Sequence, residues 1–312
     1  MKYLLIANPV SGGGLARRQI NTVVKIFERH GHKVDVRITR APGDAEVYAR
    51  WGASAGYDAI IGGGGDGTIN EVLNGMYGSD RPLAIIPWGT GNVFAKEMRF
   101  PRKLGALCRM IMKGETRRLD LGVANGRRFL LMAGAGMDGY TLRAIKGQGL
   151  KKRLGTFAYA MAAIKAFADY RYPEIQIELA DGRRDSGSFV LISNTRVYGN
   201  VFSFTPRADP SDGLLDVFVF RETGRWNTLI LALRYLGISL IDPNVARTPL
   251  GLKEDRLYRC TGLTVRSSRE VVSQVDGEVY CGLPLEFSVI PSALNVILPH
   301  RFVWTASRSE RA

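Results

Sequence analysis

Cysteines and long apolar runs are both scarce in this sequence. The three cysteines, Cys108, Cys260 and Cys281, are too few and too widely spaced for a metal-binding or redox motif, so we expect reduced thiols. The longest apolar candidate, residues 228–241, is shorter than the roughly 18 residues that a membrane-spanning helix requires, and Arg234 interrupts it. The N-terminus lacks the apolar core and cleavage site of a signal peptide. We therefore expect a cytoplasmic protein that does not cross a membrane.

Acidic residues are scarce relative to basic ones. Lys and Arg number 43 against 29 Asp and Glu, a net charge of +14, and residues 99–153 alone hold 14 basic and 3 acidic residues. Such a charge favours nucleotides, nucleic acid or an acidic membrane face as partners. The segment has no helix-turn-helix, zinc-finger or aromatic-platform pattern, so we expect no nucleic-acid binding. This leaves a plain solvated face, or a peripheral contact with an anionic surface such as the inner membrane.

Two common phosphate-binding signatures are absent as well. No Gly-x-x-x-x-Gly-Lys-Ser/Thr occurs, and no dinucleotide fingerprint is followed by its acidic residue on the next strand. Residues 134–139 match Gly-x-Gly-x-x-Gly as letters, but they lie where the strand pattern is antiparallel, so we interpret them as a structural turn. Any phosphate site must use another design.

What is present first is a regular alternation of strands and helices. Apolar runs at 3–7, 34–38, 57–61 and 83–87 alternate with helical patterns, and Ile20, Val23, Val24 and Phe27 share one face of the helix predicted at 15–30. Repeated βα units predict a parallel, doubly wound, Rossmann-like sheet. We assign this α/β domain to residues 1–118.

The rest of the chain has a different pattern. Runs with period two occur at 129–133, 175–179, 189–193, 215–220, 263–265 and 285–289, which predicts an antiparallel β-sandwich domain over residues 119–292. Basic amphipathic helices are predicted at 151–170 and 226–241, either packed on the sandwich or acting as a lid or membrane contact. The tail, about 293–312, could return to the first domain.

Three glycine-rich turns follow strands of the first domain, at residues 8–14, 62–71 and 87–92. Glycines allow close approach, and free backbone N–H groups there can face an anion. Asp66 in the second turn could orient a magnesium ion or accept a proton. Because ligands of open α/β sheets bind beyond the carboxyl ends of the strands, we expect the three turns to converge on one site.

In this order and spacing, the three turns resemble the catalytic domain of the diacylglycerol kinase family, which includes sphingosine kinases and bacterial lipid kinases. The resemblance covers nearly the whole chain and extends through residues 151–159, 212–216 and 276–278. It implies a kinase that uses ATP and Mg²⁺ and transfers the γ-phosphate to a lipid hydroxyl, that of diacylglycerol or a related lipid, in a cleft between the two domains.

The resemblance also implies roles for individual residues. The ATP site would consist of Asn8, Ser11, Gly12, Thr39, Gly64, Gly65, Asp66, Gly67, Thr68, Ile69, Asn70, Thr90 and Asn92. Asp66 would lie near the phosphates and magnesium. Glu278 would be the proton acceptor, with Asp276 orienting it or replacing it. Without the resemblance, the residues alone would favour a simple hairpin at this point.

A structural magnesium site is a further implication of the resemblance. It maps to Asp212 with backbone oxygens of Asp209 and Leu214, although the residues alone also fit a plain β-turn. One departure from the family is Val93, which follows Asn92 where many members have an acidic residue.

Other functions stay open at this point. A kinase of a soluble acceptor such as NAD shares a Gly-Gly-Asp-Gly-Thr turn, and a non-catalytic nucleotide or lipid sensor could retain the fold. No residue selects one lipid acceptor. Exposed edges of the sandwich could pair two copies, so a homodimer is compatible with the sequence.

Overall fold

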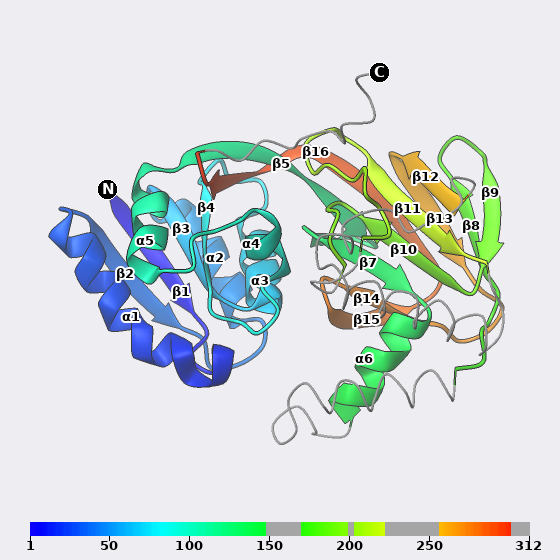
Figure 1. The fold of residues 1–312 in the computed structure, drawn as a ribbon, viewed down its shortest axis with the longest axis horizontal. Coiled ribbons are helices and arrows are strands. Elements are labelled where there is room, and N and C mark those ends of the chain that lie inside the picture. Colours follow the sequence, from blue (N-terminus) through cyan, green and yellow to red (C-terminus); the bar gives the residue numbers. More distant parts are fainter. Residues whose placement is uncertain (148–169, 199–202, 222–255, 301–312) are drawn as a thin grey trace, which may run out of the picture. The chain divides into compact units, whose positions relative to one another are not determined.

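The computed structural model describes residues 1–147, 170–198, 203–221 and 256–300, and these form two compact units (Figure 1). One unit comprises Met1–Leu121 and the chain from Ile290 onward, and the other comprises Gly122–Val289. The helix predicted at 151–170, apart from its last residue, the helix predicted at 226–241 and the family-like segment 151–159 lie outside the described residues. No helix among the described residues is long and apolar enough to cross a membrane.

The N-terminal unit is the predicted parallel α/β structure. Its elements, in chain order, are β1 (Lys2–Ala7), α1 (Ser11–Arg29), β2 (Lys33–Ile38), α2 (Asp44–Ser54), β3 (Ala59–Gly64), α3 (Asp66–Met76), β4 (Leu83–Pro87), α4 (Val93–Glu97), α5 (Leu104–Lys113) and β5 (Glu115–Ala124). The strand order is β2-β1-β3-β4, all parallel. The end of β16 (Leu285–Leu298) extends this sheet by pairing in parallel with β4.

Strand order determines where the helices of this unit lie. The chain passes from β1 to β2 in one direction across the sheet, and from β2 through β3 to β4 in the other. Because such crossovers are right-handed, α1 covers one face while α2 and α3 cover the other. Contacts agree: α1 packs on α5, and α2 on α3. The direction reverses between β1 and β3, which is where a doubly wound sheet opens a crevice for ligands.

The second unit is built from antiparallel strands in two sheets. Its elements are β6 (Arg127–Phe129), β7 (Met132–Ala135), α6 (Met137–Gly147), β8 (Ile175–Leu179), β9 (Arg184–Gly187), β10 (Phe189–Ser193), β11 (Leu215–Phe220), β12 (Leu257–Cys260), β13 (Gly262–Arg266), β14 (Val272–Val275), β15 (Glu278–Gly282) and the first part of β16. One sheet has the order β16-β13-β8-β9 and the other β12-β11-β10-β7-β14-β15. The predicted fold class, α/β followed by an antiparallel sandwich, is confirmed.

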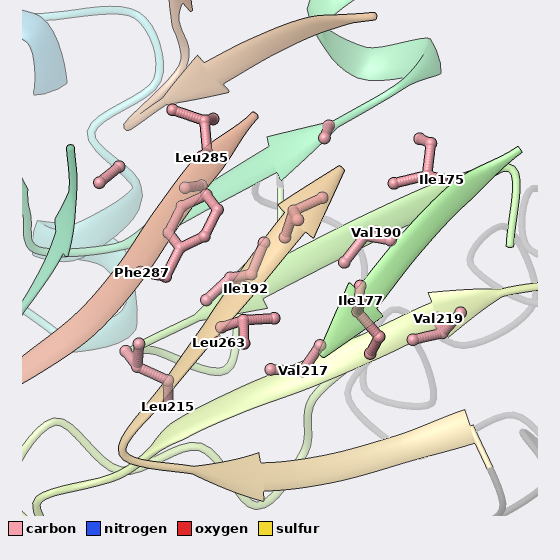
Figure 2. Packing of buried hydrophobic residues seen from close by; sticks show 14 of the residues in the cluster. Ile175, Ile177, Val190, Ile192, Leu215, Val217, Val219, Leu263, Leu285 and Phe287 are labelled. Atoms are coloured by element: carbon pink, nitrogen blue, oxygen red, sulfur yellow. The ribbon is translucent and has the colours of Figure 1, made fainter. Parts of the chain in front are cut away.

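Apolar side chains from both sheets fill the sandwich core (Figure 2). In β8, buried and exposed residues alternate strictly, so Ile175 and Ile177 point inward from one sheet. Val190 and Ile192 of β10 do the same from the other. Each buried side chain of this size contributes roughly 1.5–3 kcal/mol by leaving water. The period-two pattern in the sequence therefore correctly predicted which residues of these strands point into the core.

One predicted strand is wrong. Residues 129–133 form no continuous strand, because the chain breaks between β6 and β7 at Leu130 and Leu131. The N–H groups of these two leucines donate to the Asp276 carboxylate at 3.0 and 2.9 Å instead of to a neighbouring strand. An apolar run cannot show that its backbone donors have a side-chain acceptor elsewhere in the fold.

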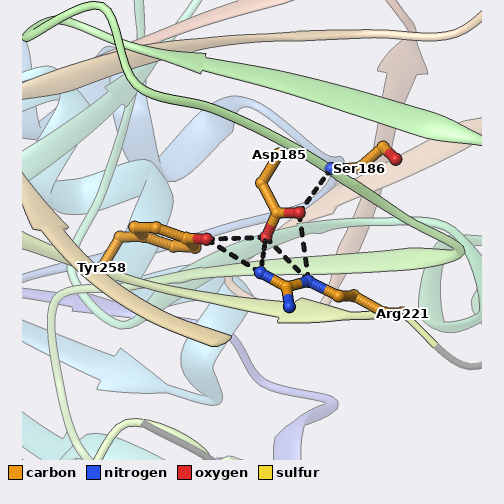
Figure 3. Close-up of polar contacts among 4 residues, drawn as sticks. All are labelled: Asp185, Ser186, Arg221 and Tyr258. Carbon is orange, nitrogen blue, oxygen red and sulfur yellow. Dashed lines mark hydrogen bonds and ion pairs between the residues drawn. The ribbon is translucent and has the colours of Figure 1, made fainter. Parts of the chain in front are cut away.

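A polar cluster joins the two sheets at one edge of the sandwich (Figure 3). Asp185 of β9 accepts hydrogen bonds from Arg221 Nη2 at 2.9 Å and from the Tyr258 hydroxyl at 2.8 Å. Arg221 follows β11, and Tyr258 lies in β12 of the second sheet. Burial alone would raise the Asp185 pKa, but the bonds from Arg221, Tyr258 and the Ser186 N–H lower it overall. The cluster thus holds an ionised carboxylate between the sheets.

Candidate active site

The first glycine-rich turn lies at the end of β1 and has a left-handed backbone. Gly12, Gly13 and Gly14 have φ angles of 59°, 64° and 90°, so the regular part of α1 begins only at Leu15. A Cβ at Gly12 would lie 2.3 Å from the carbonyl oxygen of Trp88 in the third turn. Glycine is therefore required here both for the conformation and for contact between the first and third turns.

Asn8 ties the same turn to the second one. Its backbone N–H donates to the Gly63 carbonyl at 2.9 Å, and its side-chain Nδ2 donates to Thr68 Oγ1 at 3.3 Å. The Asn8 Oδ1 accepts the Val10 N–H at 3.2 Å, which curves the chain into the turn. Asn8 acts in this structure as the link between β1 and the start of α3.

The second turn is shorter than its glycines suggested. Gly62, Gly63 and Gly64 belong to β3 and pair with β4, which leaves Gly65 as the residue between strand and helix. The glycines make room for neighbours: a Cβ at Gly63 would lie 2.4 Å from the Trp88 ring, and one at Gly64 would lie 2.5 Å from Thr68 Oγ1. α3 begins directly afterwards, and the first N–H groups of a helix have no intrahelical acceptor and favour an anion.

Asp66 is the first residue of α3 and connects the second and third turns. Its Oδ1 accepts the backbone N–H of Val93 at 2.9 Å. Val93 has an apolar side chain, and its contribution to this contact comes from the backbone. The sequence could not reveal this bond, because a backbone donor has no residue-type signature.

The third turn follows β4 and packs against the second. Trp88 and Gly89 both donate backbone N–H groups to the Gly64 carbonyl, at 2.9 and 3.1 Å. Asn92, with a left-handed φ of 50°, donates its amide to the carbonyls of Pro87 at 3.1 Å and Gly89 at 2.6 Å. The Asn92 amide was predicted to bind nucleotide, but in this structure it holds its own turn together.

The structure thus brings most of the predicted nucleotide residues together in the N-terminal unit. Ser11 and Gly12 lie in the first turn, and Thr39 follows β2, bonded through its N–H to the Ala7 carbonyl at 2.9 Å. The Asn70 side chain is buried in α3, where its Oδ1 accepts from Asn74. Thr90 is exposed in the third turn. A small pocket is lined by Gly64, Gly65, Asp66, Ile69, Ile85, Pro87, Asn92, Phe94 and Ala95.

The predicted catalytic turn of the second unit is a tight hairpin. Asp276 and Gly277 connect β14 to β15 with φ angles of 47° and 80°, the two left-handed residues that a type I′ turn requires. Val275 pairs with Glu278 across the hairpin. Glu278 is half-buried at the first position of β15.

Asp276 is an anchor for the backbone. It is 5% exposed, and its two carboxylate oxygens accept the N–H groups of Leu130, Leu131 and Met132 at 3.0, 2.9 and 3.1 Å. Its own N–H donates to the Met132 carbonyl at 2.8 Å. A carboxylate so fully engaged is poorly placed to take a proton from a substrate, which leaves Glu278 as the candidate base.

The predicted structural metal residues share one loop before β11. The Asp209 carbonyl accepts the Asp212 N–H at 3.3 Å, and Asp212 Oδ1 accepts the Leu214 N–H at 3.0 Å. The other Asp212 oxygen is paired with the Arg259 guanidinium, which also lies 3.5 Å from Asp216 Oδ2. Burial raises the pKa of Asp216 to about 6, with Arg259 opposing the rise and Asp212 adding to it.

This loop does not fit magnesium as it stands. Oxygen ligands suit Mg²⁺, but the single side-chain ligand, Asp212, already has a cationic partner. In the described part of the chain, no group of three or more His, Cys, Asp or Glu side chains could hold a metal ion.

The chain thus consists of a parallel α/β unit, in which three glycine-rich turns bond one another, and an antiparallel sandwich. Residues 2–124 match the diacylglycerol kinase catalytic domain, and residues 132–298 match the YegS C-terminal NAD kinase beta sandwich-like domain. The chain belongs to the diacylglycerol kinase family of lipid kinases.

The similarity to known proteins extends over almost the full length of both chains. A diacylglycerol kinase of Bacillus subtilis is 29% identical over 301 residues, 95% of each chain. A protein of Pseudomonas aeruginosa named probable lipid kinase YegS-like is 30% identical over 305 residues, 96% of this chain and 94% of the relative. The crystal structure of a diacylglycerol kinase from Bacillus anthracis superposes with a TM-score of 0.76 at 25% identity, covering 97% of this chain and 98% of that one.

Proposed function

We propose that this protein transfers the γ-phosphate of ATP to the hydroxyl group of a lipid, diacylglycerol or a related one. The observation that carries the proposal is the linkage of three glycine-rich turns around the start of α3, in a chain from a kinase family. Asn8 bonds Thr68, Gly64 bonds Trp88, and Asp66 bonds Val93. Tight backbone packing of this kind suits a phosphate chain better than a bulky apolar ligand.

The N-terminal unit supplies the phosphate-binding half of the reaction. Backbone N–H groups of the first turn and of the start of α3 would receive the phosphates, and Asp66 would position them. Mg²⁺, bound with the nucleotide beside Asp66, would neutralise charge on the transferred phosphoryl group. Because phosphoryl transfer depends mainly on positioning and electrostatics, the hydrogen bonds that fix these turns are part of the catalytic design.

The second unit supplies the acceptor half. A lipid hydroxyl is a weak nucleophile, so a base that removes its proton during the transfer speeds the reaction. Glu278 is the carboxylate suited to this role, because it is partly exposed whereas Asp276 holds three backbone donors. We assign ATP to the domain predicted at 1–118 and the lipid to the domain predicted at 119–292; in the structure the chain divides into the corresponding units at Leu121 and Val289.

The decisive experiment uses the full chain with labelled ATP and a total lipid extract, followed by identification of the phosphorylated product by mass. We expect one class of phospholipid product that requires Mg²⁺ and is lost in Glu278→Gln. Parallel reactions contain NAD as the acceptor, or no acceptor. Phosphorylated NAD, or binding of ATP without transfer to any lipid, would contradict the proposal.

A further inference from the structure

Trp88, in the third turn, contacts both the first turn and the end of β3. A Cβ at Gly63 would lie 2.4 Å from its ring, which therefore packs directly on that glycine. Its backbone N–H donates to the Gly64 carbonyl at 2.9 Å, and its own carbonyl oxygen is the atom that a Cβ at Gly12 would meet at 2.3 Å. Trp88 is 2% exposed. A shift of this residue would disturb all three glycine-rich turns together.

The indole N–H of Trp88 is bonded by a side chain of α1. Its Nε1 donates to Gln19 Oε1 at 2.8 Å, across 69 residues of the chain. An indole nitrogen can donate but not accept, so the amide presents its oxygen to the ring. Loss of this acceptor would leave a buried donor unpaired, which is unfavourable. Gln19 thus stabilises Trp88 in the position that the structure gives it.

Gln19 belongs to the helix that follows the first turn. It lies in α1 between Ala16 and Ile20, two residues of the face that packs on the sheet, and is itself half-buried. This face fixes the body of the helix, because α1 contacts β2 and β3 along it. The third turn is therefore attached to α1 at two places, through the close contact at Gly12 and through the hydrogen bond to Gln19.

We propose that Gln19 is a positioning residue for the ATP phosphates: by accepting the Trp88 indole N–H it fixes the third turn against the first. The backbone N–H groups of the first turn and of the start of α3 then stand ready for an anion before it binds. Donors that are already in place bind an anion more tightly, because no free energy is spent on ordering them. The effect on ATP rests on the proposed function, whereas the effect on the turns does not.

The first test measures the turns directly, by hydrogen exchange of the Trp88 and Gly89 N–H groups, which both donate to the Gly64 carbonyl. Gln19→Met removes the acceptor and keeps the length of the side chain. We expect faster exchange at these two groups than in the wild type, with little change in β1. Unchanged exchange, or an equal acceleration throughout the sheet, overturns the inference whatever the protein phosphorylates.

Two control variants separate the hydrogen bond from a general disturbance of α1. Gln19→Glu keeps an oxygen acceptor at the same position along the side chain, so we expect exchange close to that of the wild type. Asn21→Leu replaces another amide of α1 by an apolar group at an exposed position, and should also exchange as the wild type does. An effect in either variant as large as that of Gln19→Met overturns the inference.

The second test is a double-mutant cycle on the binding of ADP with Mg²⁺, measured by titration calorimetry on the full chain. Trp88→Phe removes the indole N–H and keeps an aromatic ring. We expect Gln19→Met and Trp88→Phe each to raise the Kd about tenfold, and the double variant to be no worse than either, because both remove the same bond. In the kinase assay the KM for ATP should rise by a similar factor, with little change in the KM for the lipid.

The outcomes separate the inference from the proposed function. An unchanged Kd in Gln19→Met, or effects that multiply in the double variant, overturn the role of Gln19 while ATP binding by the wild type stands. A wild type that binds no ADP overturns the proposed function, and with it the role of Gln19 towards ATP; the exchange rates of Trp88 and Gly89 then still decide whether Gln19 fixes the third turn.

Discussion

Gly12 and Gly13 have nearly the same backbone conformation but different surroundings. Their φ angles are 59° and 64°, yet a Cβ at Gly12 would lie 2.3 Å from the Trp88 carbonyl oxygen, whereas a Cβ at Gly13 meets nothing within 4 Å. Alanine in a left-handed conformation costs about 1–2 kcal/mol at either position. Only an alanine at position 12 would also push the first turn away from the third.

We therefore expect Gly12→Ala to lower the free energy of unfolding by more than Gly13→Ala, by about 1–3 kcal/mol, the range for overpacking. Chemical denaturation of both variants measures the difference. Equal stabilities would show that the first turn can shift away from Trp88 without loss of stability. That result would contradict a rigid packing of the first turn on the third.

Asp276 and Glu278 are two residues apart but should respond differently to the same kind of change. Asp276→Asn removes a charged acceptor of three buried N–H groups, and we expect a loss of about 2–4 kcal/mol in the free energy of unfolding. Glu278→Gln should leave stability nearly unchanged while abolishing phosphotransfer. Denaturant unfolding and the kinase assay, run on both variants, check this. If Asp276→Asn is as stable as the wild type but inactive, then Asp276 is the better candidate for the catalytic base.

At the scale of elements, the cluster of Asp185, Arg221 and Tyr258 predicts how the two sheets of the sandwich are held at one edge (Figure 3). The Asp185 side chain is 12% exposed and that of Arg221 is 36% exposed, so water screens the pair in part. We expect Asp185→Asn to lower the free energy of unfolding by about 1–2 kcal/mol at neutral pH. Asp181→Asn is the matched control, because Asp181 and its partner Arg183 are both exposed to solvent. We expect this variant to have the same free energy of unfolding as the wild type.

The sign of the pH dependence follows from the lowered pKa of Asp185. A carboxylate with a lowered pKa in the folded state stabilises the protein above its unfolded pKa, and this contribution disappears as pH falls through the folded value. The difference between wild type and Asp185→Asn should therefore shrink in acid. A difference that stays constant down to pH values below about 3 would mean that Asp185 acts through packing alone.

At the scale of the molecule, the excess of basic residues predicts peripheral binding to an anionic membrane. Arg102 and Lys103 are exposed within the basic segment 99–153, and each Lys or Arg near such a surface contributes about 1 kcal/mol. We expect binding to phosphatidylglycerol vesicles that weakens steeply between about 50 and 500 mM salt. The double variant Arg102→Glu/Lys103→Glu should bind about tenfold more weakly or worse.

Lys25→Glu/Arg29→Glu is the control, because it makes the same charge change at exposed positions of α1, outside the segment. An equal loss in both variants would mean that overall charge, and not this segment, attracts the membrane. Binding that does not depend on salt would contradict the electrostatic mechanism itself.

The pattern of apolar residues and turn residues was enough to predict the architecture and the positions of the three glycine-rich turns. Hydrophobic period and turn composition are local properties, so β1, β4, β8, β10 and β11 lie within one residue of their predicted bounds, and the three glycine-rich turns follow parallel strands as expected. β3 begins two residues later than predicted and β16 continues to Leu298, and at residues 129–133 the predicted strand is broken because its N–H groups bond a distant carboxylate.

Which polar groups bond one another could be seen only in the folded structure. Asp276 accepts from Leu130, 146 residues away in the chain, and Asp66 accepts from a backbone N–H of Val93 that no residue type announces. Arg259 pairs with Asp212, where the resemblance implied a metal, and Gln274 accepts the N–H of Gly277. The physical reason is that backbone donors are chemically alike in every residue, so only the packed fold selects the partner of each buried charge.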